Sequence, residues 1–84
     1  MNYYVYIIKS ETDQSWYFGF SENPEKRLDY HNDGWSRYTK SKVPWKLIFC
    51  RRFDIKTEAL KFELYLKKTR NKEYIKRVYS EYFI

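Results

Sequence analysis

A glutamate inside an apolar helical stretch is the residue best suited to chemistry. A helical wheel at about 100° per residue places Glu63 between Ala59 and Leu60, in the middle of an apolar arc. Burying an unpaired carboxylate is strongly unfavourable, so Glu63 must be neutralised, ion-paired or bound to a metal ion. A structural ion pair with Lys67, four positions later, or with Arg27 is the alternative to a metal site.

Arg27 and His31 form a second candidate group. They are four residues apart, so on a helix both side chains leave the same face and converge on one anionic group. An arginine can fork onto a phosphate, and a neutral histidine can accept or relay a proton. A solvated arginine and a surface histidine are the alternative interpretation.

Two tyrosines complete the candidate catalytic set. Tyr6 and Tyr17 stand in separate aromatic segments that predict a hairpin, which would bring both phenols to the same end of a sheet. A tyrosine near a cation or an arginine loses its proton more easily than its unperturbed pKa of about 10 suggests. Because the chain contains 10 tyrosines, a packing role is the alternative for either one.

A polar segment between residues 34 and 46 combines aromatic and basic side chains. This composition is typical of contact with phosphates and stacked bases, whereas a solvated loop is the alternative. The candidate nucleic-acid-binding residues are Trp35, Arg37, Lys40, Lys42 and Lys46.

Regular elements must position these residues. Asn23 and Pro24 are typical of a helix start, and Gly34 is typical of the residue after a helix end. Short runs of aromatic and branched residues predict strands, and helical periodicity begins at Thr57. We expect an α+β fold with a three-stranded antiparallel sheet flanked by helices. The order is β-β-α-β-α-α: strands over residues 3–8, 15–20 and 46–53, and helices over 24–32, from 57 onward and over 72–79.

Length and charge narrow the function classes. The chain has 84 residues, which predicts a single domain over residues 1–84. Its formal net charge of +6 favours polyanionic partners such as nucleic acid. No apolar run approaches the roughly 20 residues that cross a bilayer, so we expect a cytoplasmic protein without a membrane partner.

Five motifs occur in an order that resembles the GIY-YIG endonuclease family. The resemblance is strongest to its short stand-alone bacterial members, related to the N-terminal nuclease of the excision-repair complex. Two departures are Tyr4 in place of the first motif's glycine and Phe18 in place of the second motif's isoleucine. The motifs are Tyr4-Val5-Tyr6, Tyr17-Phe18-Gly19, the helix from Glu25 to Asn32, Arg37-Tyr38-Thr39-Lys40 before Pro44-Trp45-Lys46-Leu47, and the stretch from Glu58 to Glu63.

The resemblance implies a metal-dependent DNA endonuclease that hydrolyses phosphodiester bonds in DNA repair, recombination or processing. It implies Glu63 as the ligand of Mg²⁺ or Mn²⁺, with DNA as partner and with specificity coming from DNA structure or a protein partner. Asn71 is matched to a downstream polar residue that assists in some members. A non-catalytic nucleic-acid-binding module on the same fold is the main alternative, and a protein interaction domain is another. The implied catalytic residues are Tyr6, Tyr17, Arg27, His31 and Glu63.

Overall fold

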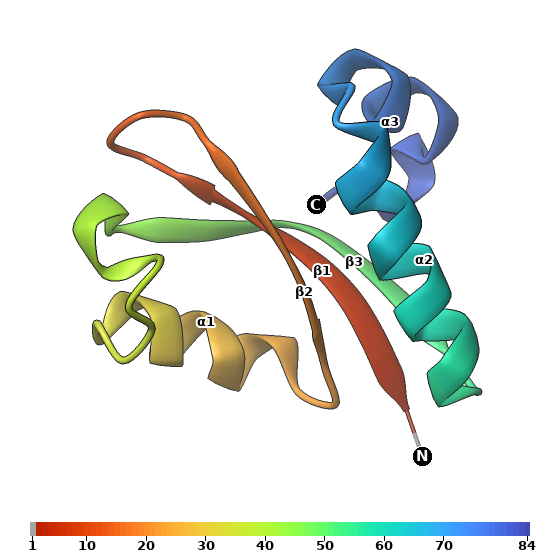
Figure 1. The fold of residues 1–84 in the computed structure, drawn as a ribbon, viewed down its shortest axis with the longest axis horizontal. Coiled ribbons are helices and arrows are strands. Elements are labelled where there is room, and N and C mark those ends of the chain that lie inside the picture. Colours follow the sequence, from red (N-terminus) through yellow and green to blue (C-terminus); the bar gives the residue numbers. More distant parts are fainter. Residues whose placement is uncertain (1) are drawn as a thin grey trace.

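A computed structural model describes residues 2–84 and has the expected α+β architecture. Strands β1 (Tyr3–Ser10), β2 (Trp16–Ser21) and β3 (Trp45–Phe53) form a three-stranded antiparallel sheet in the order β2-β1-β3. Helix α1 (Pro24–Asn32) lies on one side of the sheet, and α2 (Lys56–Thr69) lies on the other side together with α3 (Lys72–Val78) (Figure 1). Short 3-10 helices span Lys40–Lys42 and Ser80–Tyr82. The predicted order of strands and helices is confirmed.

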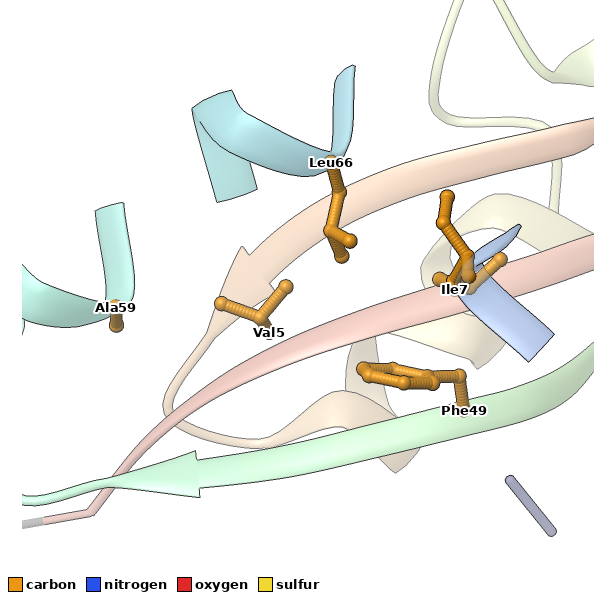
Figure 2. Close-up of a cluster of buried hydrophobic side chains, with 6 residues drawn as sticks. Val5, Ile7, Phe49, Ala59 and Leu66 are labelled. Carbon is orange, nitrogen blue, oxygen red and sulfur yellow. The ribbon is translucent and has the colours of Figure 1, made fainter. Parts of the chain in front are cut away.

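The pleat of β1 divides the buried side chains into two clusters. Val5 and Ile7 point toward α2, whereas Tyr6 and Ile8 point toward α1. Figure 2 shows the first cluster between the sheet and α2. This cluster contains Val5, Ile7, Phe49, Ala59, Leu66 and Ile75; the second contains Tyr6, Ile8 and Trp45 with Leu28 packed against it.

The apolar face of α2 is narrower than the sequence suggested. Ala59 and Leu66 are buried, but Leu60 is 40% exposed and Leu64 is 53% exposed. A helix lying on a sheet buries only one stripe of side chains, here at positions 59, 62 and 66. The expectation that Glu63 lies in the middle of the buried arc is therefore wrong: it lies at the border of that stripe.

Local hydrogen bonds fix both ends of α1. The Asn23 side chain accepts a hydrogen bond from the Lys26 backbone N–H at 3.2 Å, as expected for a cap. Gly34 has φ 82° just beyond the helix, a conformation that favours glycine. The Trp45 backbone N–H donates to the Asn32 side chain at 2.6 Å, and the Asn32 amide donates back to the Trp45 carbonyl at 3.1 Å. These two bonds tie the end of α1 to the start of β3.

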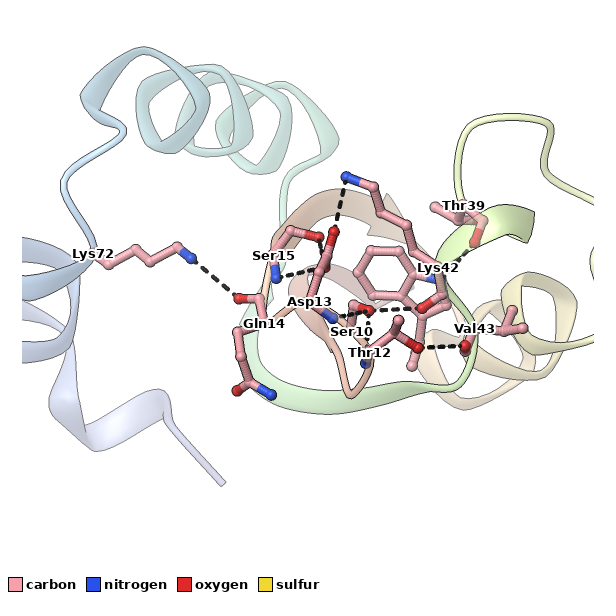
Figure 3. A network of polar contacts seen from close by, with 10 residues as sticks. Ser10, Thr12, Asp13, Gln14, Ser15, Thr39, Lys42, Val43 and Lys72 are labelled. Carbon is pink, nitrogen blue, oxygen red and sulfur yellow. Dashed lines mark hydrogen bonds and ion pairs between the residues drawn. The ribbon is translucent and has the colours of Figure 1, made fainter.

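The hairpin between β1 and β2 holds the irregular segment that follows α1. Ser10 donates to the Lys42 carbonyl at 2.7 Å, and Thr12 donates to the Val43 carbonyl at 2.9 Å (Figure 3). Lys42 Nζ also lies 3.5 Å from an Asp13 carboxylate oxygen. β1 continues through Ser10, two residues beyond the predicted strand end, and its last residue provides one of these contacts.

Candidate active site

A buried chain of three polar side chains connects β1 with α1 and the loop that follows. The Tyr6 hydroxyl oxygen lies 3.1 Å from Nε2 of His31, and Nδ1 of His31 lies 2.8 Å from the Thr39 hydroxyl oxygen. All three side chains are buried. Trp45 Nε1 donates to the Thr39 carbonyl at 2.9 Å and holds the loop in place. The interpretation of His31 as a surface residue is therefore wrong.

Thr39 is a site residue that the sequence did not single out, although it lies within one of the five motifs. Within residues 2–84 its hydroxyl has no hydrogen-bond partner besides His31, and the tautomer of His31 determines which of the two groups donates. With the ring hydrogen on Nε2, Thr39 donates to Nδ1 and Nε2 donates to the Tyr6 oxygen. With the ring hydrogen on Nδ1, His31 donates to Thr39 and the Tyr6 hydroxyl donates to Nε2.

Three of the other predicted catalytic residues act electrostatically on the Tyr6 hydroxyl. Burial is the main cause that raises the pKa of Tyr6 above its ordinary value. Hydrogen bonding to Arg27 and the positive charge of Arg27 oppose that increase, whereas negative charge on Tyr17 and Glu63 adds to it. The structure therefore brings Tyr6, Tyr17, Arg27 and Glu63 into one electrostatic neighbourhood, with His31 in direct contact.

Arg27 has unused hydrogen-bonding capacity inside the site. Its Nε atom is buried and has no hydrogen-bond partner among the described residues. Its guanidinium carbon lies 4.4 Å from the centroid of the Tyr30 ring, which supports the group on one side. A buried donor without an acceptor is costly, and the forked guanidinium geometry matches a phosphate or carboxylate. The site is suited to an anionic ligand.

Tyr17 occupies a more open position than Tyr6. The register places Tyr17 opposite Ile8 and Gly19 opposite Tyr6, so both tyrosines lie on the α1 side of the sheet. The Tyr17 ring contacts His31 edge-on, with centroids 4.8 Å apart, and is half-buried at the outer strand. The hairpin does bring the two tyrosines together, but only Tyr17 is open to solvent.

Gly19 leaves the space that the Tyr6 ring occupies. A Cβ atom built on Gly19 would lie 2.6 Å from Cε1 of Tyr6 and still closer to Cζ and the hydroxyl oxygen. Atoms of a larger residue would overlap the ring, so the ring lies across the backbone of β2. Steric overlap with the Tyr6 ring therefore explains why the third residue of Tyr17-Phe18-Gly19 is glycine.

Glu63 combines an ion pair with a position within electrostatic range of the Tyr6 hydroxyl. Its side chain is 17% exposed, and one carboxylate oxygen lies 3.5 Å from Lys67 Nζ. The expected pair with Lys67 is thus formed, while no Glu63–Arg27 ion pair is present in residues 2–84. These residues contain no group of three or more His, Cys, Asp or Glu side chains that could hold a metal ion. A single accessible carboxylate fits Mg²⁺, which commonly binds through one or two carboxylates and several waters.

The predicted nucleic-acid-binding residues are not all brought together. Trp35, Arg37 and Lys40 are exposed on the loop after α1, and Lys42 is paired with Asp13. Lys46 lies between Trp45 and Leu47, which face the α1 cluster, so its side chain points to the opposite side of the sheet. The loosely matched Asn71 caps α3 by accepting a hydrogen bond from Tyr74 N–H at 3.0 Å.

The buried His31 predicts a loss of stability in mild acid. Burial, and secondarily the Arg27 charge, lower the pKa of His31 below its ordinary value of about 6.5. The unfolded chain then binds more protons than the folded one, so the free energy of unfolding should fall as pH drops below about 6.5. Urea unfolding between pH 7.5 and 5 measures this effect. His31 is the chain's single histidine, so its NMR titration gives the pKa directly; a pKa above 6.5 would contradict the prediction.

Comparison with known proteins identifies related chains. A family model described as the GIY-YIG catalytic domain matches residues 2–77. UPF0213 protein YazA of Bacillus subtilis is 41% identical over 81 residues, which cover 95% of this chain and 79% of that protein. UPF0213 protein CPE1444 of Clostridium perfringens is 44% identical over 72 residues, covering 83% of this chain and 76% of that protein.

A solved structure of a related protein has a similar fold. The solution NMR structure of UPF0213 protein BH0048 from Bacillus halodurans matches with a TM-score of 0.57 and 31% identity, covering 95% of this chain and 84% of that one. No helix within residues 2–84 has the length and apolar character needed to span a membrane.

Proposed function

The chain belongs to the GIY-YIG family, and from this premise we propose that it is a metal-dependent DNA endonuclease that hydrolyses phosphodiester bonds. The observation that carries the proposal is the buried, unpartnered Arg27 Nε atom next to the Tyr6 hydroxyl. It belongs to an arginine whose hydrogen-bonding capacity the described residues do not use up, and an anionic group can use that capacity. The family makes a DNA phosphate the best-supported anion.

Arg27 would bind a non-bridging oxygen of the scissile phosphate. Its guanidinium is held against the Tyr30 ring, so the donor is positioned before the substrate arrives. Negative charge that develops on the phosphate during attack is then stabilised without reorganisation of the site. This role uses the charge of Arg27 and the direction of its N–H groups together.

Tyr17 is the better placed of the two tyrosines to contact the attacking water. Its ring is half-buried at the outer strand, whereas Tyr6 is only 1% exposed and bonded to His31. Tyr17 would orient the water through its hydroxyl oxygen, so that the water oxygen attacks phosphorus while the bond from phosphorus to the leaving oxygen breaks. His31, which is hydrogen-bonded to Tyr6 and Thr39, contacts the Tyr17 ring and would hold it in position.

Glu63 is the proposed ligand for Mg²⁺ or Mn²⁺, because its partly exposed carboxylate lies within electrostatic range of the Tyr6 hydroxyl. The bound ion would stabilise charge on the phosphate and the leaving oxygen. Lys67 shares the Glu63 carboxylate at 3.5 Å and orients it in the absence of substrate. A phosphate entering the site would compete for Lys67 and free the carboxylate.

Backbone contacts would come from the basic surface around the site. The exposed Trp35, Arg37 and Lys40 lie on one loop, and the formal net charge of +6 attracts DNA over a longer range. Such contacts position the DNA backbone and carry little sequence information. Specificity for a sequence or a repair intermediate would then come from DNA structure or from a protein partner.

Nicking of supercoiled plasmid tests the proposal. Purified protein with Mg²⁺ or Mn²⁺ should convert supercoiled plasmid to nicked circles, and a chelator should abolish the conversion. A folded protein that binds the plasmid and leaves it intact with both metals would favour the non-catalytic nucleic-acid-binding module.

Exchanging Tyr17 for Phe should lower turnover at least about 100-fold, because the oxygen that contacts the water is lost. Tyr6→Phe is the matched variant: it removes a buried oxygen that is hydrogen-bonded to His31 and should cost about 1–3 kcal/mol of unfolding free energy. Single-turnover nicking and urea unfolding separate the two effects. Near-normal nicking by Tyr17→Phe would rule out Tyr17 as the residue that activates water.

A further inference from the structure

An open hollow of about 300 Å³ lies at the outer edge of the sheet, beside the candidate active site. β2 forms this edge, because within residues 2–84 it pairs with β1 alone. Four of the five lining residues are aromatic and the fifth is basic: Trp16, Tyr17, Phe18, Tyr38 and Lys67. None of the described lining residues is acidic.

The hollow extends around the edge strand. Tyr17 reaches it from the α1 side of the sheet, whereas Trp16 and Phe18 pack against the α2-side cluster. Tyr38 comes from the loop after α1, and its ring centroid lies 5.9 Å from that of Tyr17. The hollow therefore shares Tyr17 with the site, and it shares Lys67 with the Glu63 ion pair.

We propose that this hollow binds one unpaired nucleobase of the DNA, next to the phosphate that is cut. The inference rests on the proposed function, since it names the form of DNA that the same site would prefer. A volume of about 300 Å³ is at the lower end of small-molecule pockets and suits one base rather than a base pair. Aromatic rings stack on any base, because every base has a π-face.

Charge and backbone groups around the hollow fit a nucleotide. Lys72 Nζ and Lys76 Nζ lie 5.2 Å and 5.9 Å from the centroid of the Trp16 ring, and Lys67 lines the hollow itself. These ammonium groups attract the phosphates on either side of the stacked base. The outer side of β2 also carries backbone N–H and C=O groups that pair with no other strand within residues 2–84. These groups can pair with the polar edge of a base.

The position of the hollow makes it selective for unpaired nucleotides. A base in a duplex must leave its stack before it can enter, and this costs free energy that an already unpaired base does not lose. DNA with an unpaired nucleotide should therefore bind more tightly than a fully paired duplex of the same length. A stacked base would place its own phosphate beside Tyr17 and Glu63.

Fluorescence anisotropy with chelator present tests binding without cleavage. The probes are labelled duplexes of equal length: fully paired, with one bulged nucleotide, and with the same bulge lacking its base. The bulged duplex should bind at least about 10-fold more tightly than the paired one, and the abasic bulge should bind like the paired duplex. Equal affinity for the two bulges would overturn the proposal, since flexibility rather than the base would then be recognised.

Two exposed aromatic residues of the same loop provide a matched pair of variants. Tyr38 lines the hollow and is 70% exposed, whereas Trp35 lies outside it and is 72% exposed. Tyr38→Ala should abolish the preference for the bulge. Trp35→Ala removes a proposed backbone contact that both duplexes share, so it should lower both affinities and keep their ratio. If both variants lose the preference for the bulged duplex, or if neither does, the proposal that the hollow binds a base is overturned. Because no cleavage is needed, this preference can hold or fail independently of plasmid nicking.

Discussion

The Glu63→Gln variant should nick DNA at least about 100-fold more slowly than the unchanged protein with either Mg²⁺ or Mn²⁺. Glutamine keeps the shape of the side chain but removes the negative charge that a divalent cation requires. It also removes the partner of Lys67, which is 49% exposed and can be solvated instead. The measurement is single-turnover nicking across a range of metal concentrations.

Glu58→Gln is the control, because Glu58 is an exposed glutamate on the same helix and undergoes the same chemical change. It should nick at the rate of the unchanged protein, and thermal unfolding should show both variants folded. If Glu63→Gln stays within about 10-fold of that rate, Glu63 is only the ion-pair partner of Lys67 and the metal is held elsewhere.

The Gly19→Ala variant should lose about 1–3 kcal/mol of unfolding free energy, because the added Cβ overlaps the buried Tyr6 ring. The ring cannot move outward without leaving His31, so its displacement also breaks the bond that positions Tyr6. Both stability and nicking should fall. Urea unfolding gives the free energy, and the His31 ring signals in NMR report the broken contact.

A double variant identifies the cause of that loss. In a Tyr6→Leu background the atoms that overlap the new Cβ are absent, so Gly19→Ala should cost less than it does alone. Gly34→Ala is a different kind of control. Its Cβ meets nothing closer than 3.9 Å, and only its φ of +82° is strained. Strictly additive costs for Tyr6→Leu and Gly19→Ala would show that the ring overlap is not the cause.

Elements with local signals could be predicted from the sequence. The Asn23 cap and Pro24 determine the start of α1, and two short runs rich in aromatic and branched residues determine the hairpin. The width of the buried face of α2 could not be predicted, because it depends on how many partners surround the helix. Leu60 and Leu64 have the same spacing as core residues and are nevertheless exposed.

The candidate site could be predicted only where its residues are linked by a local pattern. The spacing of Arg27 and His31 is local, and the structure does bring both to the Tyr6 hydroxyl. Thr39 was missed because long-range bonds from the hairpin and Trp45 bring its loop to His31. The different exposure of Tyr6 and Tyr17 likewise depends on the strand register.

Lys46 shows how one irregularity changes a surface. The β1–β3 pairing shifts between Ile7 and Ile8, where Phe49 and Leu47 are consecutive partners and Ile48 is skipped. An extra residue in a strand reverses the alternation of side chains beyond it. Trp45 and Leu47 therefore point to α1, and Lys46 points to the other side. No local pattern in the sequence marks that bulge.

The open edge of β2 also affects self-association. An unpaired outer strand invites pairing with the same strand of a second copy, which is a common route to aggregation. Here Lys67, Lys72 and Lys76 lie around that edge, and each copy carries a formal net charge of +6. Two copies repel one another at the surface where a polyanion is attracted. Added salt weakens this repulsion, so the edge is best protected from self-pairing at low ionic strength.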